Sequence, residues 1–94
     1  MYLEIVTPEA VLLSSEVDSV TVPGIDGEFQ MLNNHAPIIS VLTKGTVKVG
    51  TNAKTVTDKI SPLFKKDASG KELSIEIAGG VVEMKDNKVI VLAD

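Results

Sequence analysis

Apolar and polar residues alternate one by one along most of this chain. The stretch Leu73–Ala78 shows the pattern most cleanly, because leucine and isoleucine there alternate with serine, glutamate and alanine. Successive side chains of a β-strand point to opposite faces of a sheet, so this period of two predicts strands with one buried face. No window of about eleven residues shows a sustained helical period with caps. The same alternation recurs in further pairs: Leu3 and Ile5, Val20 and Val22, and Val47 and Val49.

Turn-forming residues separate the predicted strands at intervals of roughly 8–12 residues, a spacing typical of β-sandwiches and barrels. Asp86-Asn87, for example, predicts a hairpin turn between two apolar runs. Apolar residues make up 44% of the 94 residues, which is enough for a two-layer core in one small domain. We therefore predict an all-β fold in which residues 1–94 form a single β-sandwich domain.

Three segments carry more detailed expectations. The stretch 52–71 is the least regular part of the chain, and we expect a loop-rich excursion in which Ile60–Phe64 pairs back onto Leu73–Ile77. Val89–Leu92 is apolar on both faces, so it is either covered on both sides or part of a subunit contact. Gly79 and Gly80 interrupt a strand-like region and predict a bulge or a close backbone approach.

The residue types that most enzymes and cofactor sites need are scarce. The chain has no cysteine and one histidine, which excludes disulfides, thiol nucleophiles and zinc sites of the common types. It shows neither the ligand spacing of a calcium-binding EF-hand nor a phosphate-binding P-loop. All nine basic residues are lysines and the net charge is −4, so nucleic acid is not an expected partner. We predict a non-catalytic protein without a metal or a cofactor.

The run from Val22 to Pro37 places turn-forming residues at both ends of one short strand. Pro23–Gly27 has tight-turn chemistry, because proline fixes φ near about −65° and glycine accepts positive φ. Asn33 and Asn34 supply a second turn, since asparagine tolerates the left-handed region. The predicted strand between the turns is Glu28–Leu32. A strand held in this way presents three polar side chains outward: Asp26, Glu28 and His35.

Together with four other fragments, this run resembles the ε subunit of F-type ATP synthases, which is named δ in mitochondria. Members of that family carry a similar Gly-x-x-Gly-Glu run with an aromatic or aliphatic residue after it, ending in His-Ala-Pro. The match covers nearly the whole chain in order, except for a divergent patch at 51–71. The other fragments are an opening strand at Leu3–Glu9, a second hairpin at Glu16–Val20, and closing strands at Ala78–Glu83 and Asn87–Asp94.

The resemblance implies a β-sandwich of about ten short strands and a non-catalytic role in the central stalk, or rotor, of the F1Fo complex. In that role the protein couples the proton-driven rotation of the c-ring to the γ subunit and to ATP synthesis. The implied partners are γ and the c-ring, at the cytoplasmic face of the bacterial inner membrane as a peripheral part of F1. Membrane association only through the complex agrees with the lack of any apolar run near the ~18–20 residues of a membrane span.

Many family members continue past the last strand into a helical hairpin that restrains ATP hydrolysis and, in some members, binds ATP. This chain stops at Asp94, so we expect no C-terminal helical domain and no inhibition of hydrolysis by that mechanism. Either the protein is a short form of the family or the chain is truncated.

The resemblance also implies two contact surfaces. The residues that match the loop touching the polar loops of the c-ring are Asp26, Gly27, Glu28 and Phe29. The contact with γ is expected at His35, Ala36, Pro37, Ile38, Ser40, Val41 and Leu42. Taken alone, these residues also have purely structural interpretations: a backbone-bonded His35, a solvated Glu28, a core Phe29 and a buried strand at Ile38–Leu42.

The alternative function is a stand-alone β-sandwich that binds a small ligand or a carbohydrate. Such a protein needs exposed aromatic rings or a polar pocket, and this chain has one tyrosine and two phenylalanines. An autonomous hydrolase is a third hypothesis. It would have to build a Ser-His-Asp triad from a single histidine and without a Gly-x-Ser-x-Gly motif.

Overall fold

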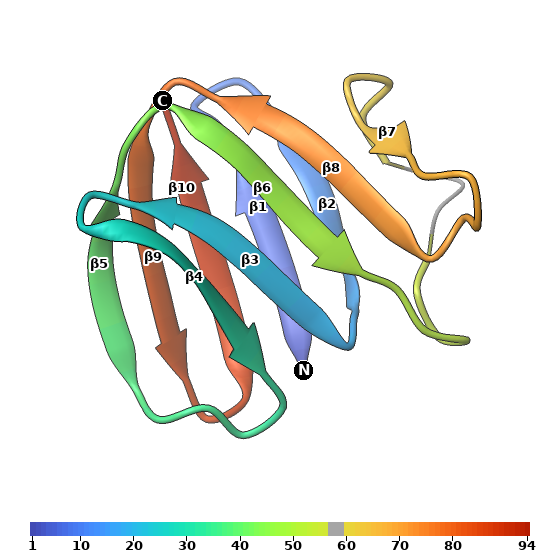
Figure 1. Ribbon diagram of the computed structural model, residues 1–94, viewed down its shortest axis with the longest axis horizontal. Helices are drawn as coiled ribbons and strands as arrows, with labels where there is room; N and C mark the ends of the chain where they lie inside the picture. The colour runs from blue at the N-terminus through green and yellow to red at the C-terminus, as the bar shows by residue number, and fades with distance from the viewer. Residues whose placement is uncertain (57–59) are drawn as a thin grey trace.

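The computed structural model describes residues 1–56 and 60–94, and these residues form ten β-strands (Figure 1). The all-β prediction is confirmed. No helical segment in the described ranges has the length and hydropathy of a membrane span. The strands are β1 (Tyr2–Val6), β2 (Val11–Glu16), β3 (Ser19–Gly24), β4 (Gly27–Leu32), β5 (Ile38–Leu42), β6 (Gly45–Gly50), β7 (Lys65–Lys66), β8 (Glu72–Ile77), β9 (Gly80–Lys85) and β10 (Lys88–Ala93).

The strands form two layers that are joined along one continuous hydrogen-bonded path (Figure 1). The first layer has the order β2-β1-β10-β9-β5, and the second has the order β4-β3-β6-β8-β7. A single residue pair, Gly24 with Leu42, connects β3 of the second layer to β5 of the first. The backbone N–H of Thr43 donates to the carbonyl oxygen of Pro23 beside that pair, over 2.9 Å. We call this connection the layer junction.

The core lies between the layers and is built from the alternating residues that the sequence singled out. Leu3 and Ile5 of the first layer and Leu73 of the second are fully shielded from solvent. Burying a side chain of this size stabilises the folded state by about 1.5–3 kcal/mol. The predicted inward faces are therefore confirmed, and they include four further shielded residues: Val20, Val22, Val47 and Val49.

The turns adopt the backbone conformations expected of asparagine and glycine. Asp86 and Asn87 have φ angles of 53° and 61°, as a tight two-residue turn between β9 and β10 requires. Asn34 has a φ of 64° in the turn after β4. At Gly80 a Cβ atom would lie 2.2 Å from the carbonyl oxygen of Leu92, so the predicted close backbone approach is confirmed.

The prediction of a hairpin at Glu16–Val20 is wrong. β2 pairs with β1, whereas β3 pairs with β4, β5 and β6, so this segment carries the chain from the first layer to the second. Val17 is fully shielded at the crossing. An apolar side chain that must be buried at this corner explains why two strands adjacent in sequence do not pair with each other.

The irregular stretch at 52–71 also pairs differently from the prediction. Lys65 and Lys66 of β7, and not Ile60–Phe64, lie opposite Ser74 and Leu73 of β8. Ile60 and Phe64 instead turn their side chains against the core as partly buried residues, which draws their backbone away from the edge of the sheet. Residues 57–59 of this excursion lie outside the described residues.

Candidate functional site

The outer face of the first layer carries a row of apolar side chains that lie directly opposite one another. Val41 of β5 pairs with Val81 of β9, and Val81 pairs with Leu92 of β10. Their exposed fractions are 55%, 37% and 55% in that order. Leu92 pairs in turn with the half-buried Val6 of β1. We call Val6, Leu92, Val81 and Val41 the apolar row.

On the same outer face, the rows farther from the apolar row contain charged residues. The next row alternates apolar and acidic residues: Ile39, Glu83, Ile90 and Glu4. The row after it contains Lys85, Lys88 and Tyr2. The ammonium of Lys88 lies 3.3 Å from the carboxylate of Glu4 and links the two polar rows. The end of this layer nearest the layer junction is therefore apolar, and Ile39 continues the apolar surface into the next row.

β10 is buried on its inner face only. Val89 and Val91 are fully shielded, whereas Leu92 on the opposite face is open to solvent. The prediction that Val89–Leu92 is covered on both faces within this chain is therefore wrong. A subunit contact on the outer face stays a prediction.

An acidic turn continues from one end of the apolar row. The side chain of Ile25 is 67% exposed, and its backbone N–H donates to the carbonyl oxygen of Val41 over 3.2 Å. The residues that follow are all exposed: Asp26, Gly27 and Glu28. The carboxylate of Glu28 lies 3.6 Å from the ammonium of Lys48, and such an exposed ion pair contributes little stability. Apolar and acidic groups thus adjoin at this corner of the molecule.

Phe29, the last residue of the predicted c-ring contact, packs against the core as a half-buried side chain. It lies opposite Val22, which is fully shielded. Its ring also covers Gly24, where an added Cβ would meet a ring carbon at 2.8 Å. The structure therefore favours the core interpretation of Phe29 over that of an exposed anchor.

The structure divides the residues of β5 that were predicted to contact γ. Val41 points outward, whereas Ile38 and Ser40 are half-buried on the inner side, opposite Met84 and Val82. Leu42 is a correction: it is 4% exposed and its side chain belongs to the core, so it offers almost no surface to a partner. The alternation along β5 contained the signal for the residue that was missed, Ile39, which is 72% exposed on the same face as Val41. Ile25, Val81 and Leu92 were also missed, because only the pairing of distant strands brings them to that face.

The loop with His35, Ala36 and Pro37 lies at the other end of β5 from Val41. The Nδ1 atom of His35 is 2.7 Å from the carbonyl oxygen of Ala36, to which it donates in the tautomer with a proton on Nδ1. The backbone N–H of Asn34 donates to the side-chain oxygen of Asn87 over 2.8 Å and ties this loop to the β9–β10 turn. His35 thus has the backbone partner of its structural interpretation, and the fold does not bring it next to Val41.

The described residues offer little to the ligand-binding alternative. They contain no group of three or more histidine, cysteine, aspartate or glutamate side chains that could hold a metal ion. The three aromatic rings do not share a face: Tyr2 lies on the outer side of β1, whereas Phe29 and Phe64 pack against the core. A hollow of about 520 Å³ is lined by Val6–Pro8, Val41–Leu42, Gly80–Val81 and Leu92–Asp94, so it belongs to the apolar row.

Among the residues that the structure describes, Asp67 has a carboxyl group with a shifted pKa, and it lies in the turn between β7 and β8 of the second layer. The backbone N–H of Glu72 and the hydroxyl of Ser69 donate to Asp67 over 3.1 Å and 2.9 Å. These bonds hold the pKa of Asp67 below its ordinary value because they stabilise the charged form. Asp67 therefore stabilises the turn before β8.

Sequence comparison shows that the chain is similar to ATP synthase epsilon chains. The profile of a family described as "ATP synthase, Delta/Epsilon chain, beta-sandwich domain" matches residues 1–61. The ATP synthase epsilon chain of Desulforamulus reducens is 37% identical over 92 residues, which cover 98% of this chain and 57% of that protein. The ATP synthase epsilon chain of Chlorobium limicola is 36% identical over 92 residues, which cover 98% of this chain and 86% of that protein. The chain thus spans about half the length of the Desulforamulus reducens protein and most of the length of the Chlorobium limicola protein.

Comparison with solved structures finds chains that have the same fold as this one. A chain in the Euglena gracilis mitochondrial ATP synthase assembly of OSCP, F1 and c-ring matches with a TM-score of 0.73 and 20% identity, over 97% of this chain and 48% of that one. A chain in the central stalk and c-ring of the Tetrahymena thermophila mitochondrial ATP synthase matches with a TM-score of 0.69 and 19% identity, over 99% and 62%. At these identities the likeness is one of fold.

Proposed function

The chain belongs to the ATP synthase delta/epsilon family, and we propose on that basis that it is a non-catalytic rotor subunit in the central stalk of an F1Fo ATP synthase. In this role it couples the proton-driven rotation of the c-ring to the γ subunit and to ATP synthesis. The names of its relatives support the assignment, and so do fold neighbours in assemblies that contain a c-ring. The observation that carries the proposal is the exposed apolar row beside an acidic turn, because the two surfaces suit two different partners.

The apolar row and Ile39 form the proposed surface for γ. Ile39, Val41 and Leu92 are each more than half exposed, and a contiguous apolar patch on a small domain marks a partner surface. His35, Ala36 and Pro37 lie at the far end of β5. A contact that includes both groups therefore requires γ to run along the whole strand, a length of roughly 15 Å.

The acidic turn forms the proposed surface for the c-ring. Asp26, Gly27 and Glu28 are exposed there, and carboxylates that meet polar or basic groups fix orientation more than they add affinity. Phe29 supports the turn from the inside. Contact with the ring would hold the protein at the cytoplasmic face of a bacterial inner membrane through the complex alone, as a peripheral part of F1.

Retention on immobilised γ tests this function. Val41→Asp places a charge in the apolar row, and Gln30→Asp is a matched control at an exposed strand position of the second layer. We expect wild type and Gln30→Asp to be retained. We expect Val41→Asp to bind at least about tenfold more weakly, because burying a valine contributes about 1.5–3 kcal/mol and about 1.4 kcal/mol is tenfold in affinity.

Circular dichroism and urea unfolding establish that all three proteins are folded before retention is compared. A folded wild-type protein that γ does not retain would contradict the stalk assignment. Equal retention of wild type and Val41→Asp would move the γ surface away from the apolar row.

A further inference from the structure

The carboxylate of Glu83 lies among apolar side chains on the outer face of the first layer. The residues directly opposite Glu83 are Ile39 of β5 on one side and Ile90 of β10 on the other. Val81, two residues earlier on the same face of β9, belongs to the apolar row. Directly opposed side chains of a sheet lie about 5 Å apart at Cβ, so Glu83 has apolar neighbours on three sides. A partner that covers this surface therefore also covers the Glu83 carboxylate.

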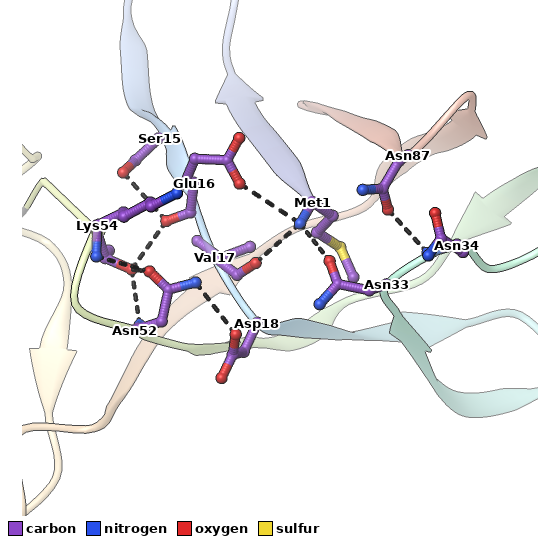
Figure 2. Close-up of polar contacts among 11 residues, drawn as sticks. Met1, Ser15, Glu16, Val17, Asp18, Asn33, Asn34, Asn52, Lys54 and Asn87 are labelled. Atoms are coloured by element: carbon purple, nitrogen blue, oxygen red, sulfur yellow. Dashed lines mark hydrogen bonds and ion pairs between the residues drawn. The ribbon is translucent and has the colours of Figure 1, made fainter.

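Other polar side chains at this end of the first layer have partners within the chain. The carboxylate of Glu4, in the same row as Glu83, lies 3.3 Å from the ammonium of Lys88. The side-chain oxygen of Asn87, in the turn after β9, accepts a bond from the backbone N–H of Asn34 over 2.8 Å (Figure 2). Within residues 1–56 and 60–94, in contrast, no ammonium group lies within ion-pair distance of the Glu83 carboxylate.

A hollow of about 520 Å³ opens beside Glu83. Its walls are formed by β5, the residue before β5 and β9, and its lining residues are Pro37, Ile38, Ile39, Glu83, Met84 and Lys85. The hollow connects the two groups of residues expected to contact γ, since Pro37 belongs to one group and Ile39 to the other. A lysine or arginine side chain suits these walls, because its methylene stem packs on apolar groups while its charged head reaches a carboxylate.

An unpaired carboxylate weakens any contact that buries it. Removing a charge from water is costly unless an opposite charge or hydrogen-bond donors take the place of the water. A partner with an apolar group opposite Glu83 would therefore lose affinity, whereas a partner with a cation there would keep it. A residue with this property distinguishes the correct partner from incorrect ones.

We propose that Glu83 determines specificity on the γ surface by pairing with a lysine or arginine side chain of γ that enters the hollow beside it. This inference rests on the proposed function, because it names γ as the occupant of the outer face of the first layer. The matching surface of γ is then apolar opposite Val41, Val81 and Leu92 and basic opposite Glu83.

The test measures the affinity of γ for wild type, Glu83→Gln and the control Glu72→Gln by titration calorimetry. Both substitutions remove one negative charge with little change of shape, and Glu72 is an exposed residue of β8 in the second layer. Long-range attraction between γ and this acidic chain therefore changes to a similar extent in both variants. We expect Glu83→Gln to bind at least about tenfold more weakly than wild type, and Glu72→Gln to bind within about twofold of it.

Lys85→Gln identifies the cation that faces Glu83 in the complex. Lys85 lies two residues beyond Glu83 on the same face of β9, so its flexible side chain is the alternative source of a positive charge. If γ supplies the cation, Glu83→Gln should weaken binding by the same factor with and without Lys85→Gln. A loss that disappears in the Lys85→Gln background would overturn the proposal.

Unchanged or tighter binding of Glu83→Gln would also overturn the proposal, because it would show that γ presents no cation at this position. The proposed function would stand in both cases, since wild type would still bind γ. A folded wild-type protein that γ does not bind would contradict the inference and the proposed function together. Urea unfolding of every variant establishes that it is folded, and we expect little change because Glu83 is exposed.

Discussion

The two layers of this sandwich have apolar inner faces, but their outer faces differ in polarity. One row across the first layer consists of Val6, Leu92, Val81 and Val41. A row across the second layer consists of Gln30, Thr21, Lys48, Ser74 and Lys65. An exposed apolar side chain adds little to the stability of the isolated chain, so the first row is informative about contacts outside the chain. The inner residues specify the fold, and the apolar outer face of the first layer is the surface that we propose for γ.

The largest expected effect contrasts the inner and outer faces of the first layer. Leu3→Ala removes a fully shielded side chain and should lower the free energy of unfolding by about 2–5 kcal/mol. Leu92→Ala, on the outer face of the same layer, should change it by less than about 0.5 kcal/mol. Urea unfolding of both variants measures the difference. Similar losses in the two variants would mean that the outer face is covered within the protein itself.

Gly80→Ala probes the backbone beneath the apolar row and should be the next largest effect. The new Cβ would meet the carbonyl oxygen of Leu92 at 2.2 Å, and the φ of 154° is strained for alanine. We expect a loss of about 1–3 kcal/mol by thermal or urea unfolding. Gly70→Ala is the control, because Gly70 also has positive φ, 74°, but no atom within 4 Å of the added Cβ. A larger loss at Gly70 would show that φ strain, and not the close approach of β10, dominates.

Ile39→Ala sharpens the functional side of the comparison. Ile39 is 72% exposed, so the free energy of unfolding should change little, whereas affinity for γ should fall by about 1–2 kcal/mol. Titration calorimetry of γ with wild type, Ile39→Ala and the second-layer control Gln30→Ala measures the affinities. A loss of affinity in Gln30→Ala, with none in Ile39→Ala, would assign the γ contact to the other layer.

The smallest expected effect is electrostatic and belongs to the second layer. The pKa of Asp67 is lowered by its bonds from Glu72 and Ser69, so its unfolded form, with a pKa of about 3.9, binds a proton first as the pH falls. The stability that Asp67 adds is therefore complete above that value and is lost as the pH drops through the lower, folded value. We expect urea midpoints between about pH 6 and 2 to fall slightly more for wild type than for Asp67→Asn. Parallel pH profiles would show that these hydrogen bonds add no stability.

Most of the fold could be predicted because the buried residues alternate with others along most strands, as in β1, β8, β9 and β10. The strand pairing of 60–66 could not be predicted from local sequence. Ile60 and Phe64 pack against the core from a loop, and the residues that pair with β8 are Lys65 and Lys66. The sequence correctly placed Asp26 and Glu28 at the surface, because glycine and proline mark such turns locally. The apolar row was only partly predictable, because Val81 and Leu92 join Val41 through strand pairs that are distant in sequence.

The layer junction determines how a force would travel through this molecule. The strand that leads into the acidic turn is bonded through its backbone to the strand that carries Val41: Thr43 donates to Pro23 over 2.9 Å, and Ile25 donates to Val41 over 3.2 Å. A load on the turn therefore enters β5 through peptide hydrogen bonds and does not depend on side chains that can slide past one another. For a protein proposed to sit between a rotating ring and a shaft, this is a short link made of backbone hydrogen bonds. We expect a twist applied at the proposed ring contact to reach the proposed shaft contact through these bonds.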